Sequence, residues 1–158
     1  SKPKCDECPL ASKCQALKLE RVGDFPYSKP KKEKPVKFAY MLVAKSDDQV
    51  YLYQRPQSGI WGGLYSFPEF ESLESAERFL LSSGVQEREV ELTADEEQMF
   101  RHTFSHYHFD IQPIFVNLTQ PFQVVAEHNQ TWLNPAAWLN EQQKVGLSAV
   151  AAKLLDQV

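Results

Sequence analysis

The cysteines of this chain are gathered in one short segment close to Ser1. Cys5, Cys8 and Cys14 follow the spacing C-x2-C-x5-C, and the chain has no other cysteine. An odd number of closely spaced cysteines favours a metal ion or an iron–sulfur cluster over disulfides, and either centre wants four ligands. The fourth ligand would be a distant histidine or a residue outside this chain, and the position of the motif favours the second. For the chain as it stands we expect three free thiols.

A second segment keeps a frame of glycines and a glutamate but lacks the charges that usually accompany it. Gly63, Glu69, Gly84 and Val85 have the spacing of the Nudix hydrolase signature G-x5-E-x7-R-E-U-x-E-E-x-G-U, which this segment therefore resembles. The positions of R-E-U-x-E-E are occupied in order by Glu77, Arg78, Phe79, Leu80, Leu81 and Ser82.

Nudix hydrolases bind divalent metal with the clustered glutamates of this segment, because such ions need hard, charged oxygen ligands. Leu81 and Ser82 stand where two of those glutamates belong and cannot supply such ligands. We therefore expect a Nudix-like fold that has lost metal-dependent diphosphate hydrolysis.

The third candidate is the run FRHTFSHYHF at residues 100–109, in which histidines alternate with aromatic residues. His102, His106 and His108 would share one face of a continuous strand and could bind zinc there. A turn at Ser105 and His106 would break that face, and Asp110 is the one acidic ligand close by. The plainer alternative is a hairpin turn that packs its phenylalanine inward and exposes its serine and histidine.

Strands are predicted on both sides of these segments. The β-branched and aromatic runs at 36–45 and 49–54, separated by Ser-Asp-Asp, indicate a hairpin. Residues 98–104 and 107–118 indicate two further strands, in which Pro113 is typical of an edge or a bulge. Residues 132–133 open a short strand or turn.

Two helices are expected among these strands. Ser72 is a suitable N-cap and Gly84 a suitable stop for a helix whose apolar face is Leu73, Ala76, Phe79 and Leu80. A last helix has the apolar face Leu147, Val150, Ala151, Leu154 and Leu155. The fold class is therefore α/β or α+β: a Nudix-like sandwich with a mixed β-sheet flanked by helices, after a short irregular N-terminal tail. We expect the tryptophans to be core or sheet-covering residues, namely Trp61, Trp132 and Trp138.

Composition divides the chain into three zones: the cysteine segment 1–18, a proline- and lysine-rich linker 19–35, and a folded domain 36–158. The net charge of −4 is uneven, because residues 69–97 carry ten acidic residues against two arginines. Charge alone neither supports nor excludes binding to DNA. Five lysines could follow phosphates, although a solvated linker explains them better: Lys29, Lys31, Lys32, Lys34 and Lys37.

The run QRPQSGIWGGLYSFPEFE, placed after the cysteine segment and the linker, resembles the C-terminal part of adenine DNA glycosylases of the MutY family. The resemblance covers essentially the whole chain. It implies that Cys5, Cys8 and Cys14 are ligands of a 4Fe-4S cluster in the full-length protein, whose first cysteine would lie just before Ser1, with no cluster held by this chain alone. The implied partners are double-stranded DNA with 8-oxoguanine opposite adenine and the protein's own N-terminal catalytic domain. In some family members the linker also docks repair proteins.

The resemblance also assigns a role to Phe104, Ser105 and His106, because in this family a Phe-Ser-His loop contacts the strand that carries 8-oxoguanine. Guanine presents a bare N7 acceptor in the major groove, whereas 8-oxoguanine presents an N7–H donor and a C8 carbonyl. A serine hydroxyl can accept from N7–H. A neighbouring aromatic ring can stack or wedge at a base step, and a histidine can contact phosphate or a base edge.

The function implied is recognition of 8-oxoguanine in base excision repair, for an N-glycosylase that removes the mispaired adenine. Its catalytic carboxylates belong to the N-terminal domain, so this chain alone is expected to be non-catalytic. The alternatives are a Nudix-type nucleotide diphosphate hydrolase and a protein-interaction module. The chain has no signal-like stretch and no apolar run near the ~20 residues of a bilayer span. We therefore expect it in the bacterial cytoplasm, associated with the nucleoid. We also expect it to be a monomer.

Overall fold

The computed structural model describes residues 3–25, 33–124 and 129–158. The chain divides into two compact units, Ser1–Glu33 and Lys34–Val158. The first unit consists of short helical turns, and none of its described residues is buried. Its elements are η1 (Cys5–Glu7), η2 (Ala11–Lys13), α1 (Gln15–Lys18) and η3 (Val22–Asp24). Of the lysines considered above, Lys29, Lys31 and Lys32 lie outside the described residues.

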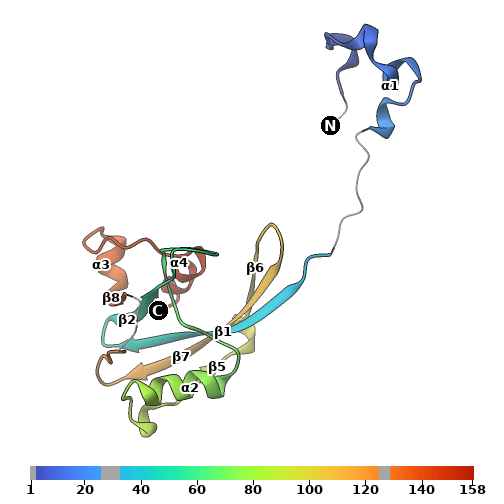
Figure 1. The fold of residues 1–158 in the computed structure, drawn as a ribbon. Coiled ribbons are helices and arrows are strands. Elements are labelled where there is room, and N and C mark those ends of the chain that lie inside the picture. Colours follow the sequence, from blue (N-terminus) through green and yellow to red (C-terminus); the bar gives the residue numbers. More distant parts are fainter. Residues whose placement is uncertain (1–2, 26–32, 125–128) are drawn as a thin grey trace. The chain divides into compact units, whose positions relative to one another are not determined.

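An eight-stranded mixed sheet forms the second unit (Figure 1). Its centre is a parallel pair, β1 (Val36–Ser46) and β7 (His108–Leu118), joined without interruption from one end to the other. The remaining pairs are antiparallel. Their strands are β2 (Gln49–Gln54), β3 (Tyr65–Ser66), β4 (Glu69–Phe70), β5 (Thr93–Ala94), β6 (Phe100–Thr103) and β8 (Gln130–Leu133).

Helices cover both faces of the sheet, with α2 (Leu73–Ser82) on one side and α4 (Ala149–Leu155) on the other (Figure 1). Because side chains alternate along a strand, β1 sends residues into both cores. Leu42 packs with the α2 side and Met41 with the α4 side. Three shorter helices complete the unit: η4 (Glu87–Glu89), η5 (Glu96–Gln98) and α3 (Pro135–Leu139). The expected α+β sandwich with a mixed sheet is confirmed.

Local signals account for where the two main helices begin and end. Ser72 caps α2 in a capping box with Ser75, and Gly84 follows the helix with a φ of +86° that favours glycine. The final helix starts later than its apolar spacing indicated, because Ser148 is its N-cap and Leu147 forms a bridge with Tyr65. Both predicted helices are therefore present, and α3 is a short addition.

Pro113 lies at a local edge, without a bulge. The pairing of β1 with β7 runs straight through Met41 and Pro113. On the other flank of β7, β6 pairs as far as Ile111 and β5 begins at Ile114. Pro113 thus stands where that flank has no paired neighbour, a place suited to a residue without an N–H donor.

Two of the tryptophans are packed as expected. Trp132 lies against Tyr51, with ring centroids 5.6 Å apart, and its indole N–H donates to the carbonyl of Phe122. The indole N–H of Trp138 donates to the carbonyl of Val145. No helix in the described ranges is long and apolar enough to cross a membrane.

Candidate functional site

The connection between β6 and β7 is a four-residue loop, residues 104–107, rather than a turn at Ser105 and His106 alone. The backbone N–H of Phe104 donates to the carbonyl of Tyr107 over 2.9 Å and closes the loop. β6 begins two residues later than predicted because residues 96–98 form a 3-10 turn capped by the Asp95 side chain. Sequence alone placed this hairpin correctly but not the length of its loop.

The side chain of Phe104 packs inward and is only partly exposed. Its ring lies 4.6 Å from His102, 4.7 Å from Tyr107 and 5.2 Å from Trp61, measured between centroids. Tyr107 is buried, and burial raises the pKa of its phenol above the ordinary value. Phe104 therefore anchors the loop in an aromatic cluster, as the plainer alternative from the sequence expected.

Ser105 and His106 form the exposed tip of the loop. The Ser105 hydroxyl oxygen and the His106 Nδ1 atom are 3.1 Å apart, within hydrogen-bond distance. The imidazole rests edge-on against Tyr107, with the ring centroids 4.9 Å apart. The tip thus presents a hydroxyl group and an imidazole to solvent from a loop whose base is packed.

Two lysines approach this loop from β1 and the residues just before it. The ammonium group of Lys34 donates to the carbonyl of Phe104 over 2.8 Å, and that of Lys37 lies 4.8 Å from the centre of the Tyr107 ring. Both belong to the lysine set that the sequence assigned to a solvated linker. Only the pairing of β1 with β7 brings them to the loop, and no local signal indicated it.

Cross-strand pairs stiffen the hairpin below the loop. Arg101 donates two hydrogen bonds to Asp110, of 2.6 and 2.8 Å, and holds the pKa of that carboxyl below its ordinary value. Nearer the tip, the Thr103 hydroxyl and the His108 Nδ1 atom are 2.9 Å apart. These contacts tie β6 to β7 over the whole length of β6.

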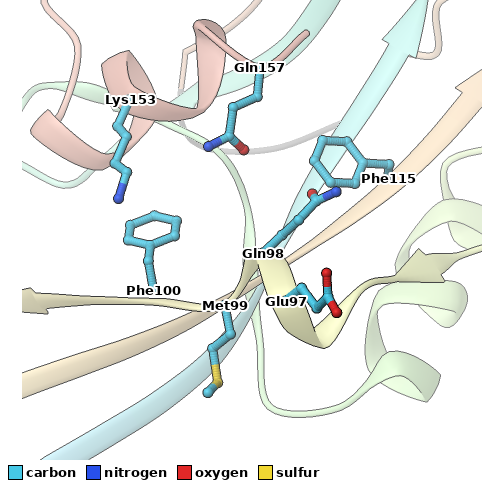
Figure 2. Close-up of a pocket in the computed structure, with 7 residues that line it drawn as sticks. All are labelled: Glu97, Gln98, Met99, Phe100, Phe115, Lys153 and Gln157. Atoms are coloured by element: carbon cyan, nitrogen blue, oxygen red, sulfur yellow. The ribbon is translucent and has the colours of Figure 1, made fainter.

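At the far end of β6 the hairpin rests on α4. The ammonium group of Lys153 lies 3.9 Å from the centre of the Phe100 ring, toward which it points (Figure 2). Together they line an open cavity of about 680 Å³, to which Met99 and Phe115 also contribute. The rest of its lining is polar and comes from Glu97, Gln98 and Gln157.

The loop of residues 55–64 holds Trp61 against the hairpin. Arg55 forms an ion pair with Glu69 and donates from Nε to the carbonyl of Ile60 over 3.1 Å. Trp61 has a φ of +56°, an uncommon conformation for a large side chain, which local packing must maintain. Gly62 is required for close approach, because a Cβ there would lie 2.3 Å from the carbonyl oxygen of Gln57.

A shallow cavity of about 510 Å³ lies beside the aromatic cluster. Its charged side chains are Lys37, Arg55, Glu69 and Glu71, and its aromatic walls include Trp61, Tyr107 and Phe109. Glu69 keeps the first acidic position of the Nudix signature, and it is already paired with Arg55. The cavity therefore combines aromatic walls with two basic and two acidic side chains.

In the Nudix-like helix α2, Leu81 and Ser82 occupy the positions of two signature glutamates. Glu77, Arg78, Leu81 and Ser82 are exposed on its outer side, while Leu80 is buried against the sheet. Among the described residues there is no group of three or more histidine, cysteine and acidic side chains that could hold a metal ion. The loss of hydrolase chemistry stays a prediction from the residue types at these positions.

The histidines and cysteines considered as metal ligands are not gathered in the structure. His102 contacts aromatic rings, His106 contacts Ser105, and His108 contacts Thr103. The thiols lie along the turns of the first unit as free cysteines and, in the part of the chain that is described, form no metal-binding group: Cys5, Cys8 and Cys14. A 4Fe-4S cluster takes four ligands, and this chain contains three cysteines.

The mixed sheet between α2 and α4, with the signature segment leading into α2, defines the class of protein. The chain belongs to the NUDIX domain family, whose model matches residues 39–157.

Relatives that match this chain in sequence are named adenine DNA glycosylase. One, from Buchnera aphidicola of Acyrthosiphon pisum, is 29% identical over 157 residues, covering 98% of this chain and 42% of the relative. Another, from Buchnera aphidicola of Schizaphis graminum, is 32% identical over 117 residues, covering 74% of this chain and 33% of the relative. This chain thus spans less than half the length of these relatives.

Solved structures share the fold at low sequence identity. The C-terminal domain of mouse MUTYH, solved in complex with human PCNA, has a TM-score of 0.58 at 18% identity, over 75% of this chain and 84% of that one. The MutT protein of Methanosarcina mazei Go1 has a TM-score of 0.57 at 12% identity, over 80% and 95% of the two chains. These similarities establish the fold alone.

Proposed function

We propose that this chain is the 8-oxoguanine-recognising C-terminal part of an adenine DNA glycosylase, which removes adenine mispaired with 8-oxoguanine in base excision repair. The observation that carries the proposal is the exposed Ser105 and His106 tip on a hairpin that is held from beneath. Relatives named adenine DNA glycosylase, one of them covering nearly the whole chain, support it. The absence of Nudix carboxylates at Leu81 and Ser82 supports a recognition role over hydrolysis.

The residue roles follow from how each side chain lies. The Ser105 hydroxyl is free to accept from the N7–H of 8-oxoguanine, and His106 can contact the base edge or a phosphate. Phe104, which the sequence offered as a wedge between bases, is proposed here to hold the loop in place. Its ring sits between Trp61 and Tyr107, and wedging would require it to leave this cluster.

DNA binding would draw on the lysines beside the loop. Lys34 and Lys37 bring positive charge to Phe104 and Tyr107, the two ends of the loop, where they could face phosphates. Contacts of this kind carry no sequence information and weaken as salt is added. We therefore assign affinity to the lysines and discrimination to Ser105 and His106.

The chemistry of excision is assigned to a catalytic domain outside this chain, since base flipping and cleavage need a pocket and carboxylates. On this proposal residues 1–18 belong to a cluster loop, 19–35 connect the domains, and 36–158 read the lesion. The spacing of Cys5, Cys8 and Cys14 supports their role as 4Fe-4S ligands in the full-length protein, where a fourth cysteine would complete the set. The proposed setting is the bacterial cytoplasm.

The test compares Ser105→Ala with the unaltered full-length protein, on duplexes with adenine opposite 8-oxoguanine or opposite guanine. We expect the ratio of single-turnover excision rates to fall by about tenfold, since a base contact contributes roughly 1–3 kcal/mol. Ser82→Ala, an exposed serine on α2, is the matched control and should leave the ratio unchanged. Equal effects of Ser105→Ala on both duplexes would contradict the recognition role.

The alternatives have their own measurements. Release of monophosphate when the chain is incubated with 8-oxo-dGTP and Mg²⁺ would favour a nucleotide hydrolase. An interaction module is suggested by the MUTYH domain, whose structure was determined with human PCNA. It would be favoured if the full-length protein kept the same 8-oxoguanine preference after replacement of all three loop residues, Phe104, Ser105 and His106.

A further inference from the structure

We infer that His106 sets the hydrogen-bond polarity of the Ser105 hydroxyl and thereby determines how strongly the loop rejects undamaged guanine. This inference rests on the proposed function and deepens it. The observation that carries it is the 3.1 Å separation of the Ser105 Oγ atom and the His106 Nδ1 atom. A hydroxyl has one proton to donate and two lone pairs, so the role it takes toward Nδ1 limits what it can offer a base.

When Nδ1 is unprotonated, the Ser105 hydroxyl donates its proton to the imidazole. The serine oxygen then faces the base with lone pairs alone. It can accept from the N7–H of 8-oxoguanine, but it opposes the bare N7 acceptor of guanine. Neutral His106 in this tautomer therefore makes Ser105 an acceptor and excludes guanine by acceptor–acceptor repulsion.

When His106 is protonated, both ring nitrogens are donors and Nδ1 donates to the serine oxygen. The Ser105 hydroxyl group then no longer donates to Nδ1 and can donate its hydrogen bond to the N7 of guanine instead. The second lone pair still accepts from 8-oxoguanine, so binding of the lesion changes little. Protonation of His106 therefore weakens discrimination mainly because the loop then accepts guanine as a hydrogen-bond partner.

Packing beneath the tip maintains the contact between Ser105 and His106. The His106 ring rests on Tyr107, which is buried, and the Phe104 N–H bond to the Tyr107 carbonyl closes the loop below the pair. On a packed base, both side chains of the tip lose less freedom when they pair. On binding DNA the tip would lose solvent, which strengthens the remaining hydrogen bond.

Among the described residues, His106 is the titratable group found in contact with the Ser105 hydroxyl. The ammonium groups of Lys34 and Lys37 face the Phe104 carbonyl and the Tyr107 ring. Burial raises the pKa of Tyr107, which therefore stays protonated well above neutral pH. His102, on β6, packs against the Phe104 ring, which lies next to the tip.

The hairpin offers a matched control pair. Thr103 and His108 also join a hydroxyl to an Nδ1 atom, at 2.9 Å, but lie below the tip on β6 and β7. If titration of any hydroxyl-bonded imidazole in this hairpin were enough to alter discrimination, a change at His108 would have the same effect as one at His106. If the tip pair is responsible, only His106 matters.

The experiment measures single-turnover adenine excision by the full-length protein, opposite 8-oxoguanine and opposite guanine, at about pH 8 and about pH 5.5, on either side of the range in which histidines titrate. The ratio of the two rates cancels pH effects on the shared chemistry. We expect the ratio to fall by about tenfold at the lower pH, mostly through faster processing of the guanine duplex.

His106→Phe keeps a ring on Tyr107 but removes the nitrogen, and His106→Gln keeps a polar group that does not titrate. Both variants should show a ratio independent of pH, whereas His108→Phe should retain the slope of the unaltered protein. A pH-independent ratio in the unaltered protein, or an unchanged slope in both His106 variants, overturns this inference. If Ser105→Ala also leaves the ratio unchanged, the proposed function fails as well. If Ser105→Ala lowers the ratio, the failure belongs to His106 alone.

Discussion

At the scale of the single residue, the role of Phe104 depends on where its ring points. An inward ring holds the loop, whereas an outward ring could wedge between bases. Because its ring fills the space between Trp61, His102 and Tyr107, Phe104→Ala should leave a cavity and lower the free energy of unfolding. We expect a loss of about 2 kcal/mol, less than for a fully buried phenylalanine, because the ring is partly exposed. Urea denaturation of the chain measures this. The exposed Leu81→Ala is the control.

The same variant should also weaken the preference for 8-oxoguanine, because the tip above the cavity would lose its support. A Phe104→Ala protein with unchanged stability and impaired recognition would instead indicate a ring that leaves its cluster to enter the base stack.

At the scale of the element, the β6–β7 hairpin is held by the Arg101–Asp110 pair. Arg101 lowers the pKa of Asp110 in the folded state, so the stabilisation is present above the carboxyl's unfolded pKa of about 3.9 and is lost as the pH falls through the lower folded value. Asp110→Asn should therefore destabilise the chain at pH 7 and reduce the loss of stability on acidification.

Urea denaturation at about pH 7 and about pH 2.5 gives both quantities, on either side of the titration of an aspartate. Some acid sensitivity should remain in the variant, because hydrogen bonds from Thr119 also lower the pKa of Glu89. Glu74→Gln, which removes an exposed carboxylate of α2, is the matched control. An Asp110→Asn protein as acid-sensitive as the original would show that the pair contributes nothing to the folded state.

At the scale of the whole molecule, the two units should be thermodynamically separable. Both hydrophobic cores draw all their members from residues 39–158, and no described residue of the first unit is buried. The unit Lys34–Val158 prepared alone should therefore melt within about 3 °C of the complete chain, a difference of about 1 kcal/mol or less for a domain of this size. Circular dichroism would follow the transition, and a markedly lower midpoint would show that the first unit stabilises the second.

The sequence by itself determined those features that depend on near neighbours. A β-branched and aromatic run predicted β1, and a partly alternating run predicted β7. Helical spacing with Ser72 and Gly84 predicted α2, and Leu81 and Ser82 showed that the Nudix carboxylates are missing. Each of these follows from the residue type at one position, or from a period of two or about four residues. The hairpin around Ser105 was within reach for the same reason.

Tertiary structure alone decided how the candidate site is supported. Lys34 reaches Phe104 across 70 residues, and Trp61 reaches the same ring from a separate loop. Lys34 meets Phe104 because β1 pairs with β7, and Trp61 does so through the pairing of β2 with β1 and β3. Local periodicity carries no information about these pairings. An inward Phe104 beneath an exposed Ser105 and His106 is therefore a property of the assembled sheet, because the packing beneath the loop chooses which side chains remain free to meet a ligand.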